Sequence, residues 1–434
     1  MNGEQALAYG GLAAGVAIVA SYPGSPGSGT VETLIDLAKH HAIYVEWSSN
    51  ERVALEIAIG ASIAGRCALV CAKSVGMNVM LDPLMALNFT PVNGGLVILL
   101  GDDPGAYGSQ NDQDTRQLAP MLEIPILEPS TPAEAFDMMR EVFAASERLK
   151  TPFIIRITRS FAQQQEPIEI TEVPNAVANI GLAREKWRFV PVPKNAVEKQ
   201  AALHERMEAA RDWQEKLLFI FVAKCREILI FEEIEPFVEN QIKAIAHDNS
   251  LSCKISGKQS GHVSREGELF RWQIQEVLSR FIPNFVPANY YSREQESLEF
   301  PKKKSYCSNC RYGEVLDILE SAATELQQMP VLIGDPGCLL TIADRLDAKY
   351  AIGSAVGVAD GISKAGAGER AIAIFGDSSF FHSTLPAICN SVHNHSNIIM
   401  VVLDNHSTMT SGLQPNPGTG KNALGRKAPN LICH

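Results

Sequence analysis

Short apolar runs recur along the first 160 residues, and polar or glycine-rich residues follow each of them. Runs of this length, four to six residues, are typical of buried strands, and the amphipathic stretches between them favour helices. The pattern predicts strands at residues 17–22, 42–46, 68–71, 95–100 and 153–157. Strands that alternate with helices indicate a parallel sheet with helices on both faces.

The same alternation returns between residues 331 and 402, where residues 371–375 and 398–403 predict strands and residues 379–389 a helix. A polar, proline-containing stretch and a charged amphipathic helix over about 197–218 separate the two regions. A strand and a helix then predict a small α/β segment, at residues 227–231 and 234–247. We predict an α/β fold with two doubly wound parallel-sheet domains, 1–162 and 301–434, and a small α/β middle domain, 163–300.

Composition narrows the class of protein. A chain of 434 residues exceeds one hydrophobic core, so two or three domains are expected. Its hydrophobic fraction of 46% is that of a soluble globular protein. A net charge of −11 without a long basic run argues against nucleic acid as a partner, because the triplet Lys302–Lys304 is too short to track phosphates.

The chain carries no predicted membrane segment, because no apolar run reaches the roughly 20 residues of a span. Residues 6–20 are apolar, but no Lys or Arg precedes them, so they predict a helix and a strand rather than a signal peptide. Nine cysteines, mostly scattered in apolar runs, indicate reduced thiols of a cytoplasmic protein and leave room for a metal site.

Polar residues end two of the predicted C-terminal strands. Gly376-Asp377-Ser378 follows one and Asp404-Asn405 the next, with 25 residues between Ser378 and Asp404. Both ends lie at the carboxyl edge of one sheet, where such folds bind ligands, and their oxygens suit Mg²⁺ beside a phosphate group. The following helix N-terminus suits a diphosphate. The alternative is a pair of strand-end turns.

This spacing resembles the GDG…NN motif of thiamine-diphosphate enzymes, with Ser378 for the second Gly and Asp404 for the first Asn. Thiamine diphosphate also needs a carboxylate beside its aminopyrimidine. Glu51 begins a predicted helix with small residues at 54, 58 and 60, which resembles the pyrimidine-binding segment of these enzymes. The alternative is an ordinary helix whose first turn favours a carboxylate through the macrodipole.

The chain resembles, segment by segment and in one order, the alpha subunits of indolepyruvate:ferredoxin oxidoreductases. These belong to the thiamine-diphosphate-dependent 2-oxoacid:ferredoxin oxidoreductases. The resemblance implies that both large domains bind thiamine diphosphate, and that the middle domain is shortened and a C-terminal ferredoxin-like module missing. The matching segments are 21–26, 45–51, 91–95, 101–105, 109–114, 232–237, 334–338, 376–383 and 414–420.

The resemblance further implies a site. Glu51 would activate the cofactor, and the Ser25 hydroxyl would lie near its thiazolium and the substrate. Asp377, Asn405 and the main-chain carbonyl of Ser407 would bind Mg²⁺. The remaining cofactor-binding positions would be Gly334, Cys338, Gly353, Ser354, Gly376 and Ser378.

The reaction implied is oxidative decarboxylation of an aryl or branched 2-oxoacid. The acyl group would pass to coenzyme A and the electrons to a ferredoxin-like acceptor. A beta subunit is expected as a partner, in a homodimer or heterotetramer.

The resemblance also implies a [4Fe–4S] cluster on four cysteines, with free thiols as the alternative: Cys307, Cys310, Cys338 and Cys433. None of the nearby histidines is assigned a catalytic role: His382, His393, His395 and His406. Two other functions stay open. A non-oxidative thiamine-diphosphate decarboxylase or lyase needs Glu51, Asp377 and Asn405 but no cluster. A non-catalytic subunit needs only the fold.

Overall fold

The computed structural model describes residues 1–170, 180–182, 188–265, 268–294, 310–328, 330–364 and 370–431. The chain divides into two compact units. The first contains Met1–Ala20, Gly24–Tyr44 and Leu55–Lys303, and the second contains Ser21–Pro23, Val45–Ala54 and Lys304–His434. Two short N-terminal segments therefore group with the C-terminal part of the chain, and one of them carries Glu51.

The first unit is built on a six-stranded sheet with the order β2-β1-β3-β4-β6-β5. Neighbours from β3 to β5 pair in parallel, and β3 and β4 are buried along their whole length. The five predicted strands are confirmed to within two residues at each end, whereas β5 has only two residues and shows no pattern. The strands are β1 (Ile18–Ser21), β2 (Tyr44–Trp47), β3 (Ala68–Lys73), β4 (Leu96–Asp102), β5 (Ile126–Leu127) and β6 (Phe153–Thr158).

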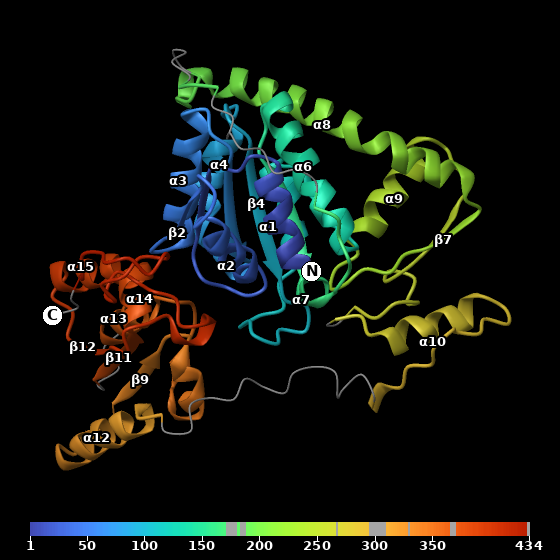
Figure 1. Ribbon diagram of the computed structural model, residues 1–434. Coiled ribbons are helices and arrows are strands. Elements are labelled where there is room, and N and C mark those ends of the chain that lie inside the picture. The colour runs from blue at the N-terminus through green and yellow to red at the C-terminus, as the bar shows by residue number, and fades with distance from the viewer. Residues whose placement is uncertain are drawn as a thin grey trace. The chain divides into compact units, whose positions relative to one another are not determined.

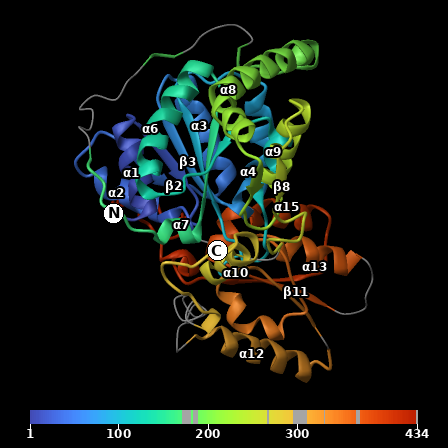
Figure 2. The same cartoon turned by 90° about the vertical axis from the view of Figure 1, so that its right-hand side faces the viewer.

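Helices cover both faces of this sheet. Figure 2 shows α1 (Gly3–Ala13) and α6 (Pro132–Leu149) on one side and α4 (Ser74–Asn88) on the other. Side-chain caps define the starts of α1 and α6, since Asn2 forms a capping box with Gln5 at α1 and Thr131 caps α6. The remaining helices are α2 (Ser28–Leu37), α3 (Glu51–Ile63), α5 (Ala119–Leu122) and α7 (Arg159–Gln163).

The predicted small α/β segment is present in the first unit. The long helix α8 (Ala196–Lys224) precedes a parallel pair of strands, β7 (Glu227–Leu229) and β8 (Lys254–Ser256). Between these strands α9 (Phe237–Asp248) packs on them, and α10 (Arg271–Phe281) follows (Figure 1). The domain limits at 162/163 and 300/301 stay predictions. No helix in the described ranges is long and apolar enough to cross a membrane.

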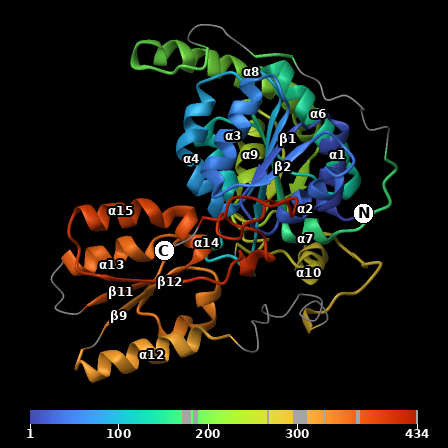
Figure 3. The same ribbon diagram turned by 60° about the vertical axis from the view of Figure 1, so that its left-hand side comes forward.

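The second unit contains a four-stranded sheet, all parallel, with the order β10-β9-β11-β12. Helix α12 (Tyr312–Glu325) packs on one face, and α13 (Ala355–Lys364) and α15 (Leu385–His393) pack on the other (Figure 3). Consecutive residues of a strand point to opposite faces of the sheet: Ile374 packs in the core on one face and Phe375 in the core on the other. The doubly wound α/β fold is therefore confirmed. The strands are β9 (Val331–Gly334), β10 (Ala348–Lys349), β11 (Ala371–Gly376) and β12 (Ile399–Leu403).

The helix predicted at residues 379–389 is interrupted. The chain leaves β11 through one turn of α-helix, α14 (Asp377–Ser379), and then forms a π-helical turn, η4 (Phe380–Thr384), before α15 begins. A π turn closes its hydrogen bonds over five residues instead of four, and such turns occur frequently at functional sites. Regular helical spacing does not predict this interruption.

Candidate functional site

The carboxyl edge of the four-stranded sheet has a topological switch point. From β9 the chain passes to β10 on one side and then, through α13, to β11 on the other. Open parallel sheets bind ligands at such points, because the connections on either side of the switch leave a crevice between them. Asp335 follows β9 and Asp377 follows β11, so both carboxylates lie at this edge.

Asp377 is 2% exposed, and its Oδ2 accepts a hydrogen bond of 2.7 Å from the Asn416 side-chain amide. Burial raises the pKa of Asp377, the Asn416 bond opposes this, and the nearby Asp404 carboxylate raises it further. A buried carboxylate next to a second carboxylate is stabilised by a cation. The Asn416 contact was not predicted, although its segment is among those that carry the family resemblance.

The end of β12 lies beside the end of β11, since Leu403 pairs with Gly376. Asn405 therefore emerges near Asp377, and its Oδ1 accepts from the main-chain N–H of Ser407 at 3.2 Å. Ser378 donates through Oγ to the carbonyl of Ser407 at 3.4 Å. The structure thus brings four predicted residues together at one edge: Asp377, Ser378, Asn405 and Ser407.

The donor chemistry of this edge fits Mg²⁺. A carboxylate, an amide oxygen and a main-chain carbonyl are all hard oxygen donors of the kind that bind Mg²⁺ together with phosphate oxygens. Across the described ranges, no three His, Cys, Asp or Glu side chains group into a metal site. The three predicted Mg²⁺ ligands include only one side chain of these types, Asp377. The other two donors are the Asn405 amide oxygen and the main-chain carbonyl of Ser407.

Asp335 organises the loop at the start of α13. Its buried carboxylate accepts from the main-chain N–H groups of Gly353 and Ala355, at 2.7 and 2.8 Å. Burial raises the pKa of Asp335 to about 6, and these hydrogen bonds oppose the increase. The predicted pair Gly353 and Ser354 is therefore held in place by a neighbouring carboxylate that sequence reasoning did not single out.

Gly353 also has a steric reason to be glycine. Its φ is +82°, and a Cβ there would lie 2.6 Å from the Cβ of Ser383 in the π turn. The loop at α13 and the π turn after Asp377 are thus packed directly against each other.

Two of the predicted cluster cysteines lie near Tyr312. Burial and the Cys338 and Cys310 thiols raise the pKa of Tyr312, and Asn405 donates to its hydroxyl at 3.0 Å. Cys338 Sγ is 3.8 Å from the Asn405 amide nitrogen. The other two predicted ligands, Cys307 and Cys433, lie outside the described residues.

Glu51 and His382 form a buried pair inside the second unit. Nε2 of His382 lies 2.8 Å from Oε2 of Glu51, and the two residues are 3% and 6% exposed. The Tyr22 ring packs edge-on against the His382 ring, with 4.6 Å between centroids. Burial and the carboxylates of Glu51 and Asp377 raise the pKa of Tyr22, which places both acids near this side chain.

Sequence reasoning gave His382 no role, because a lone histidine on a helix is usually a packing residue. His406, which the sequence places next to Asn405, is largely exposed and pairs with Asp404 at 3.1 Å. His382 follows Asp377 by five residues, and regular helical spacing does not predict which way its side chain points. The π turn η4 changes that direction, and no sequence pattern predicts this turn.

Ser25 lies in the first unit, in the loop between β1 and α2, and is exposed. The Glu4 carboxylate fixes this loop by accepting from the main-chain N–H groups of Gly27 and Gly29, at 2.7 and 3.1 Å. Across the sheet, a Cβ on Gly101 would lie 2.0 Å from the carbonyl oxygen of Pro26, so the loop crosses β4 at close range. Ser25 therefore sits on a rigidly held loop.

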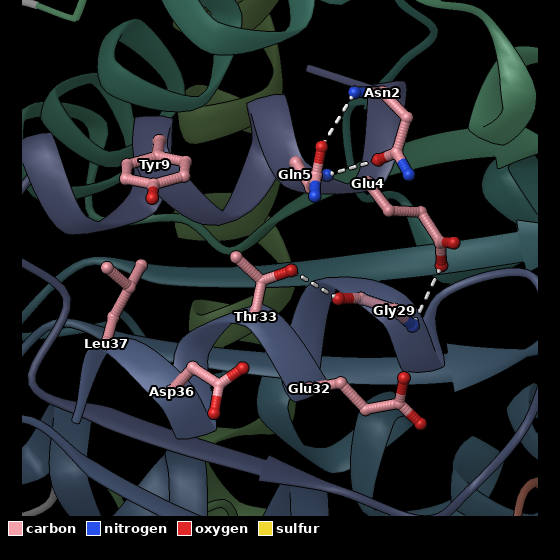
Figure 4. Close-up of a pocket in the computed structure, with 9 residues that line it drawn as sticks. All are labelled: Asn2, Glu4, Gln5, Tyr9, Gly29, Glu32, Thr33, Asp36 and Leu37. Atoms are coloured by element: carbon pink, nitrogen blue, oxygen red, sulfur yellow. Dashed lines mark hydrogen bonds between the residues drawn. The ribbon is translucent and has the colours of Figure 1, made fainter. Parts of the chain in front are cut away.

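Figure 4 shows a cavity of about 410 Å³ between α1 and α2 of the first unit. Three of the side chains that line it are acidic: Glu4, Glu32 and Asp36. Glu4 already binds the main chain of Gly29, and burial raises its pKa. None of the predicted site residues lines this cavity.

Two family models match the chain. Residues 9–214 match the thiamine-diphosphate-binding domain of pyruvate flavodoxin/ferredoxin oxidoreductases. Residues 347–431 match the C-terminal, thiamine-pyrophosphate-binding domain of thiamine pyrophosphate enzymes.

Curated relatives match almost the whole chain. The indolepyruvate oxidoreductase subunit IorA of Pyrococcus abyssi is 32% identical over 98% of this chain and 77% of its own length. The subunit of the same name from Methanothermobacter thermautotrophicus is 29% identical over 99% and 78%. A solved 2-oxoglutarate:ferredoxin oxidoreductase from Magnetococcus marinus aligns with 64% of this chain and 59% of its own, at 13% identity and a TM-score of 0.39, too low to bear on function.

Proposed function

The chain belongs to the IorA family of indolepyruvate oxidoreductase subunits, which are thiamine-diphosphate-dependent 2-oxoacid oxidoreductases, and we propose a cofactor site on this basis. In this proposal the second unit binds the diphosphate and Mg²⁺ at the carboxyl edge of β9, β11 and β12. The observation that carries this proposal is that Asp377 and Asn405 follow two parallel strands that end side by side. Hydrogen bonds from Ser378 to Ser407 and from Ser407 to Asn405 join the two strand ends.

In this proposal the Mg²⁺ ligands are the Asp377 carboxylate, the Asn405 amide oxygen and the Ser407 carbonyl. Gly376 and Ser378 begin the turn that presents them. The cofactor's phosphates would lie along Gly334–Cys338 and Gly353–Ser354, which Asp335 and the π turn hold in place. The raised pKa of Asp377 supports the assignment, since a divalent cation removes the cost of ionising a buried carboxylate.

Thiamine diphosphate, when bound, supplies the electron sink that allows a 2-oxoacid to lose CO₂. The chain's own contribution is position and charge. The Glu51 carboxylate would hold the proton exchanged with the aminopyrimidine ring, and burial among Tyr22 and His382 keeps water away from it. The Ser25 hydroxyl, on its fixed loop, would bind the substrate near the thiazolium.

The substrate we propose is an aryl or branched 2-oxoacid like indolepyruvate, because the curated relatives carry that substrate in their names. The acyl group would pass to coenzyme A and the electrons to a ferredoxin-like acceptor. Those names also describe a subunit, so we propose a beta subunit as partner, in a homodimer or heterotetramer. The limits 1–162, 163–300 and 301–434 remain our proposed domains.

Oxidation needs a route for two electrons, and we propose a [4Fe–4S] cluster on Cys307, Cys310, Cys338 and Cys433. The proximity of Cys310 and Cys338 to Tyr312 supports it, since two of the four sulfur ligands lie near one side chain. Cys307→Ser should abolish electron transfer to a viologen dye and leave thiamine-diphosphate binding intact. Undiminished dye reduction would reject the cluster.

The deciding experiment measures iron, acid-labile sulfide and bound thiamine diphosphate in anaerobically purified protein, followed by dye-linked turnover with indolepyruvate and coenzyme A. Iron, sulfide and cofactor together support the oxidoreductase. Cofactor without iron identifies a non-oxidative decarboxylase, and neither identifies a non-catalytic subunit.

A further inference from the structure

His382 is a fully enclosed ionisable side chain near the proposed cofactor site. Its imidazole has no exposed surface, and both ring nitrogens have polar partners, Glu51 at Nε2 and the Ser383 hydroxyl at Nδ1. Its main-chain carbonyl accepts from the Asn50 side-chain amide at 2.8 Å. The residue is therefore fixed at ring and backbone to the segment that carries Glu51.

The hydrogen-bond chemistry defines the direction of these contacts. When Glu51 is ionised its carboxylate only accepts, and Nε2 of His382 then carries the hydrogen and donates it to Oε2. In the neutral ring Nδ1 then accepts, and the Ser383 hydroxyl is its donor. Ser383 is itself fixed, because its Cβ packs against Gly353. The chain of contacts runs from the loop at α13 through Ser383 and His382 to Glu51.

A contribution to folding is a poor explanation for this pair. Buried ion pairs and charged hydrogen bonds are costly to desolvate and are weak evidence for stability. The pair also depends on a π turn, a rare helix defect that concentrates at functional sites. Its specific effect is to fix one oxygen of a carboxylate whose side chain otherwise rotates about three bonds, and this fixes the direction of the other oxygen.

We propose that His382 is a positioning residue: by donating from Nε2 to Oε2 of Glu51, it aims the second carboxylate oxygen at the aminopyrimidine ring of thiamine diphosphate. This inference rests on the proposed function, since it presupposes that Glu51 meets the cofactor. It assigns His382 no proton transfer of its own. The Tyr22 ring packs against the imidazole in an edge-to-face contact and limits its rotation.

The test compares two substitutions at this position. His382→Gln keeps an N–H donor close to the place of Nε2, whereas His382→Leu keeps the bulk and removes the donor. His393→Leu is the matched control, because His393 is exposed at the end of α15. For each variant, deuterium exchange at the thiazolium C2 of bound cofactor is followed by NMR, and cofactor affinity is measured by calorimetry.

His382→Leu should slow C2 exchange by about 10–100-fold, by analogy with the loss of residues that orient metal-binding side chains. Cofactor affinity should stay unchanged, and His382→Gln should restore most of the exchange. A readout on the cofactor-free protein accompanies this: the ¹H–¹⁵N spectrum of histidine-labelled protein should show His382 protonated at Nε2, and Glu51→Gln should shift that proton.

Exchange at the wild-type rate in His382→Leu would overturn the proposal. So would tighter cofactor binding in that variant, which would mean that His382 competes with the cofactor for Glu51. Including Glu51→Gln separates the two ideas. If C2 exchange of the bound cofactor is slow in Glu51→Gln and normal in His382→Leu, only the role of His382 fails. If both exchange normally, the proposed role of Glu51 fails as well.

Discussion

The buried carboxylates at the strand ends of the two sheets differ in their partners: an arginine in the first unit and a neutral amide in the second. In the first unit, Asp102 at the end of β4 is fully buried and accepts from Arg156 Nε at 2.7 Å. Asp114 nearby is bound by the Arg116 guanidinium, and although burial acts to raise its pKa, Arg116 lowers it overall. In the second unit Asp377 is equally buried, but its bound partner is the neutral amide of Asn416, and its pKa is raised.

The difference separates a structural carboxylate from one that is ready for a ligand. An acid that the chain pairs with its own guanidinium is already compensated and contributes to folding only if both partners remain. Within the described ranges Asp335 and Asp377 form no ion pair. Their partners are neutral: main-chain N–H groups and the Ser379 side chain for Asp335, and the Asn416 amide for Asp377. Such an arrangement holds the carboxylates in place while leaving their charge to attract a cation.

The strongest test of this comparison removes the cation built into the first unit. Arg156→Met leaves Asp102 buried without its partner, so the free energy of unfolding should fall by about 3–5 kcal/mol. Urea denaturation followed by circular dichroism measures it. The matched control is Arg140→Met, whose partner Asp137 is exposed and whose loss should cost less than about 1 kcal/mol. Equal effects of the two substitutions would remove the distinction between the sheets.

Not every buried carboxylate of the first unit is compensated by a cation, and among the described acids of that unit Glu268 has the largest increase in carboxyl pKa. It is 5% exposed, its Oε2 has no hydrogen-bond partner in the described structure, and burial and Glu233 raise its pKa to about 7. Between pH 4.5 and about 7 the folded protein binds this proton more tightly than the unfolded chain does, so stability falls as the pH rises through that range.

Glu268→Gln should remove that loss. The variant should gain about 1–3 kcal/mol over the wild type as the pH rises from 4.5 to 7.5, measured by urea denaturation at each pH. Parallel pH profiles for the two proteins would show that Glu268 is compensated like its neighbours.

The smallest expected effect on stability is that of Glu51→Gln. The amide oxygen of Gln still accepts from His382, and the lost macrodipole interaction at the start of α3 is worth about 0.3–1 kcal/mol. Thermal melting should therefore change little, while C2 exchange of bound thiamine diphosphate falls by roughly 100-fold or more. A large loss of stability without a change in exchange would make Glu51 a structural acid like Asp102.

Much of this contrast was predictable from the sequence. The apolar runs that became β11 and β12 are unambiguous, and the Asp377 and Asn405 positions follow from parallel pairing. Five strands of the six-stranded sheet were equally clear, whereas β5 and β8, with two and three residues, are too short to show a period and were not predicted.

The contacts that complete the site were not predictable. The Asp335 carboxylate caps a loop 18 residues away, and Asn416 reaches Asp377 across 39 residues. The Glu51–His382 pair joins positions 331 residues apart through a π turn. Local patterns define elements, whereas these contacts depend on tertiary packing that no local pattern encodes.

We expect the carboxyl edge of β11 and β12 to bind thiamine diphosphate through Mg²⁺ on Asp377. Calorimetric titration of the cofactor-free protein with thiamine diphosphate, with and without Mg²⁺, tests it directly when wild type and Asp377→Ala are compared. We expect tight, Mg²⁺-dependent binding to the wild type and loss of most of that dependence in Asp377→Ala. Unchanged Mg²⁺-dependent affinity in the variant would contradict this expectation.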